Sequence, residues 1–389
     1  MNKKLLVVAV AGALAVPGVA MAQVTISGKV GAMWQSIAFS GATAATRAGG
    51  KTSIDHIIDN SSALTFQMRE DLGGGMAAFG RIELRPTIDG QGGGSGTGAS
   101  GSTPMWVGLE STSWGNLRVG TLSGLHNVSG PDYGGVTGTP FNSTHVIMGG
   151  TATAGTVHAM ATRLRNAIAW DSLNYGGFKM TVAYSSSGAG VDNDLGTSIR
   201  KGRTWNFIPQ FIQPNWNIGY SYYDQKPDAG TGTNSAATTV AAAAAAIDEK
   251  GQRLFGEYDL RNGFKLGGAW DSYKRTAAVG GIKAQDRRAY SLQGMYVTGP
   301  HQVAVTYAKA SNDKVLGTNT GANQIGVGYM YSMSKRTNAF ATYQRVTNQS
   351  AAAYYAAGMP TPAYTGSAGM AALAGEDYRI IQVGMNHSF

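Results

Sequence analysis

The sequence predicts an all-β chain that folds as a transmembrane, antiparallel β-barrel of sixteen strands. Three observations predict it: an export signal at the N-terminus, strand segments in which apolar and polar residues alternate, and connections that alternate between short and long. The composition agrees, because 56 glycines and 18 tyrosines with only 14% charged residues are typical of many strands and turns.

Residues 1–22 have the three parts of a secretory signal peptide. Lys3 and Lys4 precede an apolar run from Leu5 to Val16, and Ala20-Met21-Ala22 forms a small-x-small cleavage site before Gln23. The apolar run is shorter than the ~20 residues that a membrane-spanning helix needs. We therefore expect cleavage after Ala22. No composition break follows, so residues 23–389 are interpreted as one barrel domain.

Charge and cysteine content narrow the function classes. The precursor carries a formal net charge of +9. No basic cluster or nucleic-acid-binding motif accompanies this charge, so we expect no nucleic-acid partner. The chain has no cysteine, which excludes disulfides and cysteine-based metal sites. We predict neither a cofactor nor a metal.

The strand segments alternate with a period of two. The first runs from Val24 to Gln35 and places Val24, Ile26, Val30 and Trp34 on one face. The same pattern recurs along the chain, for example at Phe178, Met180, Val182 and Tyr184, and at Ile325, Val327, Tyr329 and Tyr331. In the last segment Ile381, Val383 and Met385 share a face with Phe389. Each segment therefore has an apolar face, which would contact lipid, and a small polar face.

The connections between segments fall into two alternating classes. Seven short turns are predicted at 71–75, 113–116, 174–177, 213–215, 261–263, 298–300 and 334–337. Eight long loops are predicted at 36–60, 86–102, 123–160, 187–202, 225–250, 275–286, 311–322 and 348–376. Fifteen connections require sixteen strands and place both termini on the periplasmic, short-turn side. A soluble β-sandwich is the alternative, but it seldom keeps this alternation.

Several patches, in this order, resemble the general porins of Gram-negative bacteria, which are trimeric barrels of sixteen strands. They are Val24-Thr-Ile-Ser-Gly-Lys29, Glu70-Asp-Leu-Gly-Gly-Gly75, Trp106-Val-Gly-Leu109, Gly115-Asn-Leu-Arg-Val-Gly120, Arg165-Asn-Ala-Ile-Ala-Trp-Asp-Ser172, Tyr175-Gly-Gly-Phe178, Ser334-Lys-Arg-Thr337 and His387-Ser-Phe389. The resemblance implies a homotrimer whose water-filled channels let small hydrophilic solutes and ions diffuse passively. It also implies that outer-membrane lipid and lipopolysaccharide surround the barrel, and that the barrel-assembly machinery reads Phe389 as its signal.

The resemblance further implies that the third extracellular loop, residues 123–160, folds into the barrel and narrows it. Pro131-Asp-Tyr-Gly-Gly135 resembles the family's Pro-Glu-Phe-Gly-Gly turn, which puts Asp132 at the constriction. The chain departs from the family at Ala63 and Thr121, where many relatives have arginine. The charge pattern of the family's pore therefore cannot be transferred unchanged.

Strand alternation also predicts which charged residues face the lumen. With Ile82 and Leu84 outward, Arg81, Glu83 and Arg85 point inward, and the same reasoning applies to the other strands. The predicted pore wall comprises the cations Lys29, Arg69, Arg81, Arg85, Arg118, Arg163 and Arg165 and the acids Glu83, Asp132 and Asp171. Any one arginine could instead be solvated or pair with an acid to brace the wall. As a group, seven cations against three acids favour anions.

Three other functions stay open at this point. An outer-membrane enzyme would need a catalytic set, and the loop histidines His126, His145 and His158 lie in no recognisable catalytic motif; they could form a metal site or be solvated. An adhesin or receptor would act through its loops, among which the alanine-rich tract at 236–246 carries no chemistry. A substrate-selective channel would be favoured by aromatic side chains lining the pore.

Overall fold

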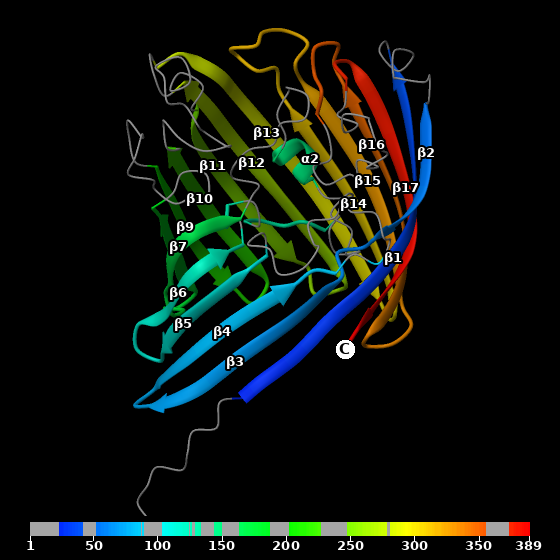
Figure 1. Cartoon of the computed structure of the whole chain (residues 1–389). Helices are drawn as coiled ribbons and strands as arrows, with labels where there is room; N and C mark the ends of the chain where they lie inside the picture. The colour runs from blue at the N-terminus through cyan, green and yellow to red at the C-terminus, as the bar shows by residue number, and fades with distance from the viewer. Residues whose placement is uncertain are drawn as a thin grey trace, which may run out of the picture.

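The computed structural model describes residues 23–41, 52–86, 88, 103–123, 125–126, 129–133, 144–149, 163–186, 202–226, 247–277, 281–354 and 373–389. The proposed signal peptide, His158 and the alanine-rich tract lie outside these ranges. The described strands form one closed antiparallel sheet (Figure 1). Among the described residues, no helix is long and apolar enough to cross a membrane.

Strands and one short helix follow each other along the chain. They are β1 (Gln23–Gly41), β2 (Ser53–Asp59), β3 (Ala63–Gly73), β4 (Met76–Leu84), β5 (Met105–Ser111), β6 (Gly115–Leu122), α2 (His145–Met148), β7 (Leu164–Asp171), β8 (Phe178–Ser185), β9 (Arg203–Gln213), β10 (Trp216–Lys226), β11 (Ile247–Asp259), β12 (Phe264–Ala277), β13 (Lys283–Thr298), β14 (His301–Ala310), β15 (Ala322–Ser332), β16 (Thr337–Asn348) and β17 (Glu376–Ser388).

The strands β2 and β3 form a single span of the barrel. Both pair with β1, with Asp59 opposite Ala32 and Ala63 opposite Lys29. Between them Ser61 adopts a positive φ of 54°. The Ser62 amide donates to Asp59 Oδ2 at 2.9 Å, which compensates locally for the interrupted ladder. Seventeen strand segments therefore make sixteen spans, and the prediction of a sixteen-stranded barrel is confirmed.

The predicted end of the first strand was wrong. β1 continues to Gly41 and β2 begins at Ser53, so much of the predicted loop at 36–60 is strand. The reason is a change of the apolar face. Below this region Val24 and Ile26 are exposed on the outer wall, whereas Ile37 and Phe39 are buried in a cluster with α2. The predicted strand ended at Gln35 because the outward-facing apolar residues end there, although the strand itself continues with its apolar residues on the inner face.

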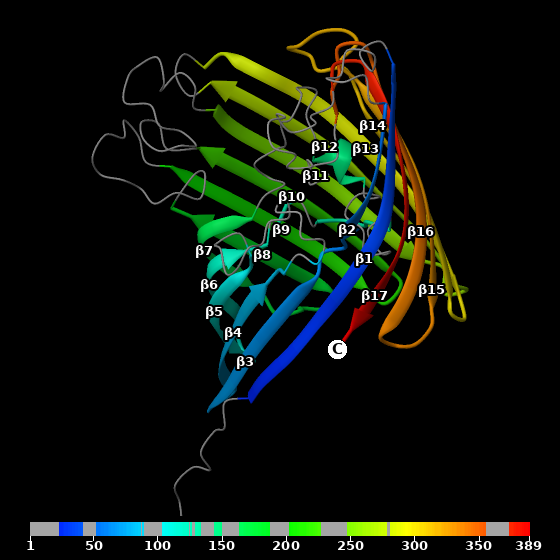
Figure 2. The ribbon, with the colours of Figure 1, turned by 45° about the vertical axis from the view of Figure 1, so that its right-hand side comes forward.

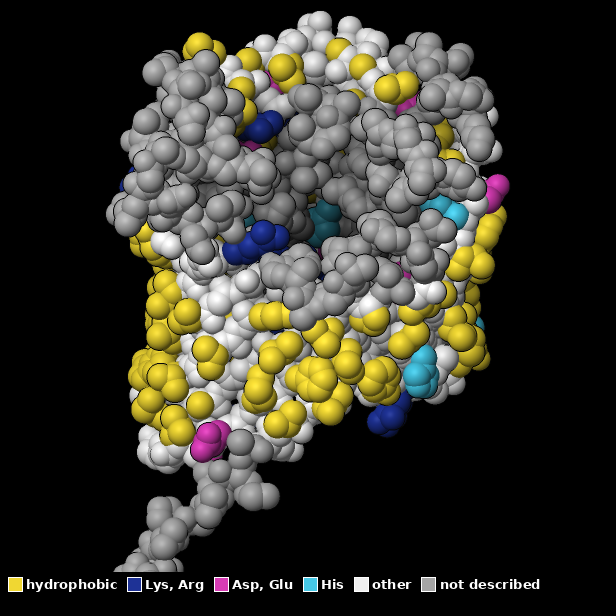
Figure 3. All heavy atoms as spheres, viewed as in Figure 1, with side chains coloured by type: hydrophobic (Ala, Val, Ile, Leu, Met, Phe, Trp, Pro, Cys, Tyr) yellow, Lys and Arg dark blue, Asp and Glu magenta, His cyan; other side chains and the backbone are white. Residues whose placement is uncertain are grey.

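The outer wall is apolar. Large side chains on alternate positions are exposed, including Val107, Leu254 and Leu292 at 64%, 53% and 63%. Figure 3 shows hydrophobic side chains gathered over the outer wall of the barrel. Such a surface would be a liability in water, and it matches the lipid-facing band of a transmembrane barrel.

The barrel closes between its first and last strands. β1 pairs with β17 from Lys29 opposite Ser388 to Gly41 opposite Glu376, so no open sheet edge separates them. Figures 1 and 2 both show the C-terminus beside β1, at the short-turn end of the barrel. Because the start of β1 lies beside the end of β17, the beginning of the first strand and the end of the last strand are on the same, short-turn side of the barrel, as predicted.

Candidate functional site

The third extracellular loop folds into the barrel, as predicted. The described part of this loop comprises residues 125–126, 129–133 and 144–149. Helix α2 lies inside the barrel in both ribbon views (Figures 1 and 2) and contacts β13, β14 and β15. Val146, Ile147 and Met148 of α2 are buried in an apolar cluster that includes Ile37 of β1 and Ile380 of β17. The loop is thus held partly by apolar packing against the upper inner wall.

Two arginines and one aspartate on the wall hold the loop backbone; we call Arg253, Asp271 and Arg287 the loop anchor. Asp271 is fully buried and forms ion pairs with Arg253 Nη2 at 3.1 Å and with Arg287 Nη2 at 3.2 Å. Arg253 Nη1 donates to the carbonyls of His126 and Ser129 at 3.1 and 3.2 Å. Because the acid orients both guanidinium groups, it controls the loop without contacting its backbone.

Arg287 performs the same task for the helix end of the loop. Its Nη2 donates to the Met148 carbonyl at 3.1 Å, and its Nη1 donates to the Ile147 carbonyl. These are C-terminal helix carbonyls, which have no partner within the helix. A cation at this end also interacts favourably with the helix dipole.

Between these contacts, Gln293 of β13 binds the middle of the loop. The Tyr133 amide donates to Gln293 Oε1 at 2.7 Å, and Gln293 Nε2 donates to the Pro131 carbonyl at 2.7 Å. Burial, together with the nearby Glu257 carboxylate, raises the pKa of the Tyr133 hydroxyl well above its usual range. Gly267 of β12 permits this approach, because a Cβ there would lie 2.7 Å from Pro131.

His126 is part of this buried network rather than a solvated side chain. Its Nδ1 lies 2.7 Å from Ser221 Oγ, and its Nε2 lies 3.5 Å from Asp271 Oδ2. Burial lowers the pKa of the imidazole, and the hydrogen bond to Asp271 offsets this only partly. His145 lies 3.5 Å from Asp132. Among the described residues, no group of three or more His, Cys, Asp or Glu side chains is placed to hold a metal ion.

Near the end of β4 the structure brings together four of the charged residues predicted to line the pore, Arg81 and Glu83 on the strand, Arg85 just after it and Arg163 just before β7. We call Arg81, Glu83, Arg85 and Arg163 the arginine cluster. Glu83 is buried and accepts from Arg81 at 2.5 Å and from Arg85 at 2.7 Å. Arg163 lies within electrostatic reach of Arg85 and Glu83. Three cations surround one acid, so the cluster keeps a net charge of +2.

Two of the remaining predicted cations of the pore wall are paired with acids outside the arginine cluster. Arg69 contacts Glu110 at 2.5 Å, and Arg118 contacts Asp171 at 2.7 Å. Lys29 interacts electrostatically with Asp59 and Arg85. The parity argument cannot be extended to Arg165, because Asn166 has a positive φ of 47° and the ladder between β6 and β7 shifts register after Gly120. At the start of β7, Leu164 is buried and Arg165 is exposed.

The arginine cluster and the loop anchor lie on opposite walls. In the ring of sixteen spans, β4 and β12 are eight spans apart. The loop is fixed to the wall at β11–β13, which leaves the arginine cluster facing it across the lumen. Sequence reasoning missed the anchor, although inward parity in β11, β12 and β13 could have indicated Arg253, Asp271 and Arg287 as it indicated the residues on β4.

A scan against protein-family models matches residues 7–351 to the Gram-negative porin family. The chain belongs to this family. Together with its barrel, the membership makes the chain an outer-membrane porin that forms a channel. No curated protein sequence matches it.

Solved structures share the fold of this porin at low sequence identity. An anion-selective porin from Comamonas acidovorans is 21% identical with a TM-score of 0.70, and the match covers 95% of this chain and all of the other. OmpF of Salmonella typhi, in a complex with daunomycin, is 12% identical with a TM-score of 0.61, covering 95% and 98%. The channel DcaP of Acinetobacter baumannii is 13% identical with a TM-score of 0.59, covering 95% and 97%.

Proposed function

We propose that this porin lets small hydrophilic solutes and ions diffuse passively across the outer membrane, with a moderate preference for anions. The observation that carries the preference is the arginine cluster, where Arg81, Arg85 and Arg163 surround a single buried acid. The third loop is anchored on the opposite wall. Solutes therefore pass between the loop and the cluster, and a narrow aqueous passage keeps ions close to the wall charge.

Ion-selectivity measurements test this proposal. The assembled protein is inserted into a planar bilayer, and the reversal potential is measured across a potassium chloride gradient. We expect a sign that corresponds to chloride preference in dilute salt. The preference should shrink in molar salt, because the screening length falls from ~8 Å at physiological ionic strength to ~3 Å. Cation selectivity in dilute salt would contradict the assignment of the arginine cluster to the passage.

Three expectations about assembly belong to the same proposal. Residues 1–22 are removed as a signal peptide, the barrel-assembly machinery recognises Phe389, and three barrels associate as a homotrimer. The apolar outer wall and the common use of closed symmetry support the trimer. Chemical cross-linking in mild detergent should give a trimer band. Cross-linking that yields monomers alone would oppose it.

The proposed activity is transport without catalysis. In the described part of the chain, Ser221, His126 and Asp271 have the residue types of a catalytic triad, with Ser221 Oγ 2.7 Å from His126 Nδ1 and Asp271 Oδ2 3.5 Å from His126 Nε2. Their exposed fractions are 0%, 1% and 0%, so His126 and the serine hydroxyl beside it are closed to substrates. The neighbouring Arg253 and Arg287 donate to loop carbonyls. A structural role in fixing the loop accounts for every one of these contacts.

A further inference from the structure

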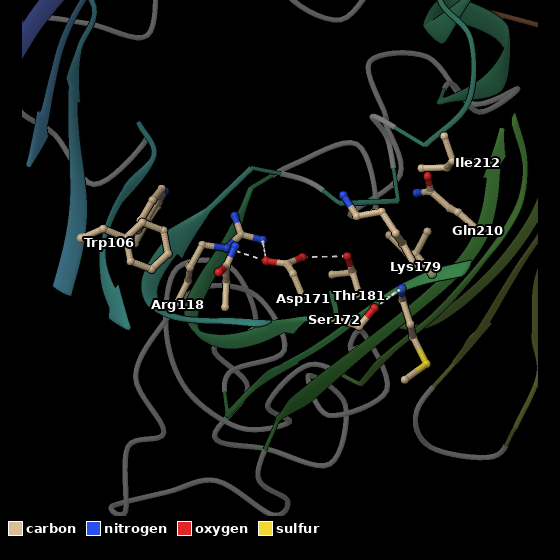
Figure 4. Close-up of a pocket in the computed structure, with 12 residues that line it drawn as sticks. Trp106, Arg118, Asp171, Ser172, Lys179, Thr181, Gln210 and Ile212 are labelled. Atoms are coloured by element: carbon tan, nitrogen blue, oxygen red, sulfur yellow. Dashed lines mark hydrogen bonds and ion pairs between the residues drawn. The ribbon is translucent and has the colours of Figure 1, made fainter. Parts of the chain in front are cut away.

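A pocket opens on the inner wall near the short-turn end of the barrel, separate from the loop anchor. It has a volume of about 410 Å³ and is lined by residues of β4–β9. We call it the side pocket, and its lining residues used below are Phe79, Trp106, Arg118, Lys179, Ile208 and Ile212. Figure 4 shows Trp106 at one end, Ile212 and Gln210 at the other, and Arg118, Asp171 and Lys179 between them.

The side pocket has apolar walls where strand alternation normally supplies polar lumen residues. Phe79 meets the Trp106 ring edge-on with centroids 5.0 Å apart, and the Arg118 guanidinium lies 5.6 Å from the same ring. Trp106 is thus fixed on two sides. Ile208 and Ile212 form the other wall, with Ile208 only 4% exposed.

One cation in the side pocket is uncompensated. Both oxygens of Asp171 are occupied, Oδ2 by Arg118 at 2.7 Å and Oδ1 by the Thr181 hydroxyl at 2.7 Å. Arg118 and Asp171 therefore neutralise each other. The Lys179 ammonium has no acidic partner within 4 Å in the part of the chain that the structure describes. The pocket keeps a net charge of +1 beside an apolar wall.

Lys179 is also in register with that apolar wall. Its Cα partner on β9 is Gln210, which places Ile208 and Ile212 as the diagonal neighbours on the same face. Diagonal neighbours in antiparallel strands are within reach of long side chains. A ligand whose anionic group contacts the ammonium therefore places its remaining atoms against the two isoleucines.

We propose that the side pocket is a binding subsite for monocarboxylates that carry an aromatic ring. Lys179 binds the carboxylate with a charge-assisted hydrogen bond. The ring lies on the partly exposed Ile212, next to the nearly buried Ile208, and Trp106 and Phe79 close the far end. A single free cation suits one carboxylate better than a dianion, and the apolar walls favour a ring over a purely polar anion. The inference rests on the proposed function and names a preferred class within its solutes.

Benzoate tests this subsite, with acetate as the equally charged anion that has no ring and benzamide as the neutral ring. The assembled protein is placed in a planar bilayer, and current noise is recorded while each compound is added on the short-turn side. We expect benzoate to block in a saturable way at concentrations where acetate and benzamide do not. Equal behaviour of benzoate and acetate would overturn the subsite.

Two variants locate the site. Lys179→Met keeps the stem and removes the charge, and it should weaken benzoate block roughly tenfold. Ile212→Thr keeps a β-branched residue and all charges, and it should weaken the block about fivefold with an unchanged reversal potential. Lys29→Met is the matched control, since it removes one inward-facing lysine from β1 without touching the pocket. Equal weakening by Lys29→Met and Lys179→Met would overturn the assignment.

Binding without conduction separates this inference from the proposed function. Ligand-observed nuclear magnetic resonance on the assembled protein in detergent reports benzoate contact directly, and Lys179→Met should reduce its signal. If chloride preference is found and benzoate contact is not, the porin function stands and the subsite fails. If benzoate binds at Lys179 and the channel prefers cations, the subsite stands and the anion preference fails.

Discussion

Gly28 and Phe389 exchange two backbone hydrogen bonds, each 3.0 Å between the amide nitrogen of one and the carbonyl oxygen of the other. The pair continues the β1–β17 ladder one step beyond Lys29 and Ser388. The Phe389 ring lies over Gly28, where a Cβ would collide with its Cζ and Cε1 atoms. The glycine thus provides the space that the ring occupies at the seam of the barrel.

We expect Gly28→Ala to destabilise the seam. The added methyl group displaces the Phe389 ring, and overpacking of this kind costs about 1–3 kcal/mol. Gly294→Ala is the matched control, because a Cβ there would have only Leu266 within 4 Å, at 3.7 Å. The measurement is the thermal unfolding midpoint of the assembled barrel in detergent. Equal unfolding midpoints for the two variants would show that the position of the Phe389 ring does not require a glycine at position 28.

Phe389→Ser should reduce assembly in cells far more than it reduces stability in detergent. The side chain is 49% exposed, so its burial contributes ~2 kcal/mol at most. The larger loss should come from recognition by the assembly machinery. Refolded variant protein should therefore form barrels in vitro, while the amount of assembled barrel in outer membranes falls sharply. A normal amount of assembled Phe389→Ser barrel in outer membranes would contradict the proposed role of Phe389 as an assembly signal.

Asp271→Asn should loosen the third loop. The buried carboxylate orients Arg253 and Arg287, and removing one partner of a buried ion pair destabilises by about 3–5 kcal/mol. We expect a lower unfolding midpoint and larger fluctuations of single-channel current, since the loop carbonyls lose oriented donors. Asp259→Asn, in an exposed pair with Lys265 on β12, is the control. Quiet single-channel currents from Asp271→Asn would indicate that apolar packing of α2 fixes the loop alone.

Acidification should weaken the same loop contacts through His126. Burial holds the pKa of this imidazole below its ordinary value near 6.5, with the Arg253 charge lowering it further and Asp271 raising it. Between the lowered folded pKa and about 6.5, the unfolded chain binds a proton that the folded chain excludes. Stability therefore rises with pH in this window and is lost as pH falls below about 6.5.

The check is the unfolding midpoint of wild type and His126→Asn between pH 7.5 and 5.5. The wild-type midpoint should fall with acidification, and the variant should show a flatter profile from a lower starting value. His145, whose pKa burial also lowers, should keep the variant's profile from being fully flat. Identical slopes for both proteins would exclude His126 as the group that titrates.

Removing charge from the arginine cluster should change selectivity. In the double variant Arg81→Gln with Arg163→Gln, Arg85 stays paired with Glu83 at 2.7 Å and the net charge of the cluster falls from +2 to zero. The reversal potential should move toward cations in dilute salt, and less so in molar salt. The control is Arg345→Gln with Arg379→Gln, which removes two exposed arginines from outward positions of β16 and β17. Matching shifts in both double variants would point to net charge rather than the cluster.

The sequence by itself determined the architecture. A period of two fixes which residues face outward, and alternating connection lengths fix the number of spans and the side of each terminus. These are local properties of the chain, readable without knowing any partner strand. The same parity groups Arg81, Glu83 and Arg85 on one face, and both arginines pair with Glu83 in the structure. This parity does not extend to Arg165, where a positive φ at Asn166 interrupts the alternation, so the place of Arg165 in the pore wall stays a prediction.

Only the tertiary structure decided which charges compensate each other and what the third loop touches. Asp271 lies 18 residues from Arg253 and 16 residues from Arg287, the two arginines that it orients. Arg253 Nη1 in turn donates to the carbonyl of His126 across a separation of 127 residues. Arg287 reaches Ile147 across 140 residues. Such pairings depend on the closure of the barrel and on where the loop crosses it. Periodicity assigns a side chain to a face, but its charge partner is set by long-range packing.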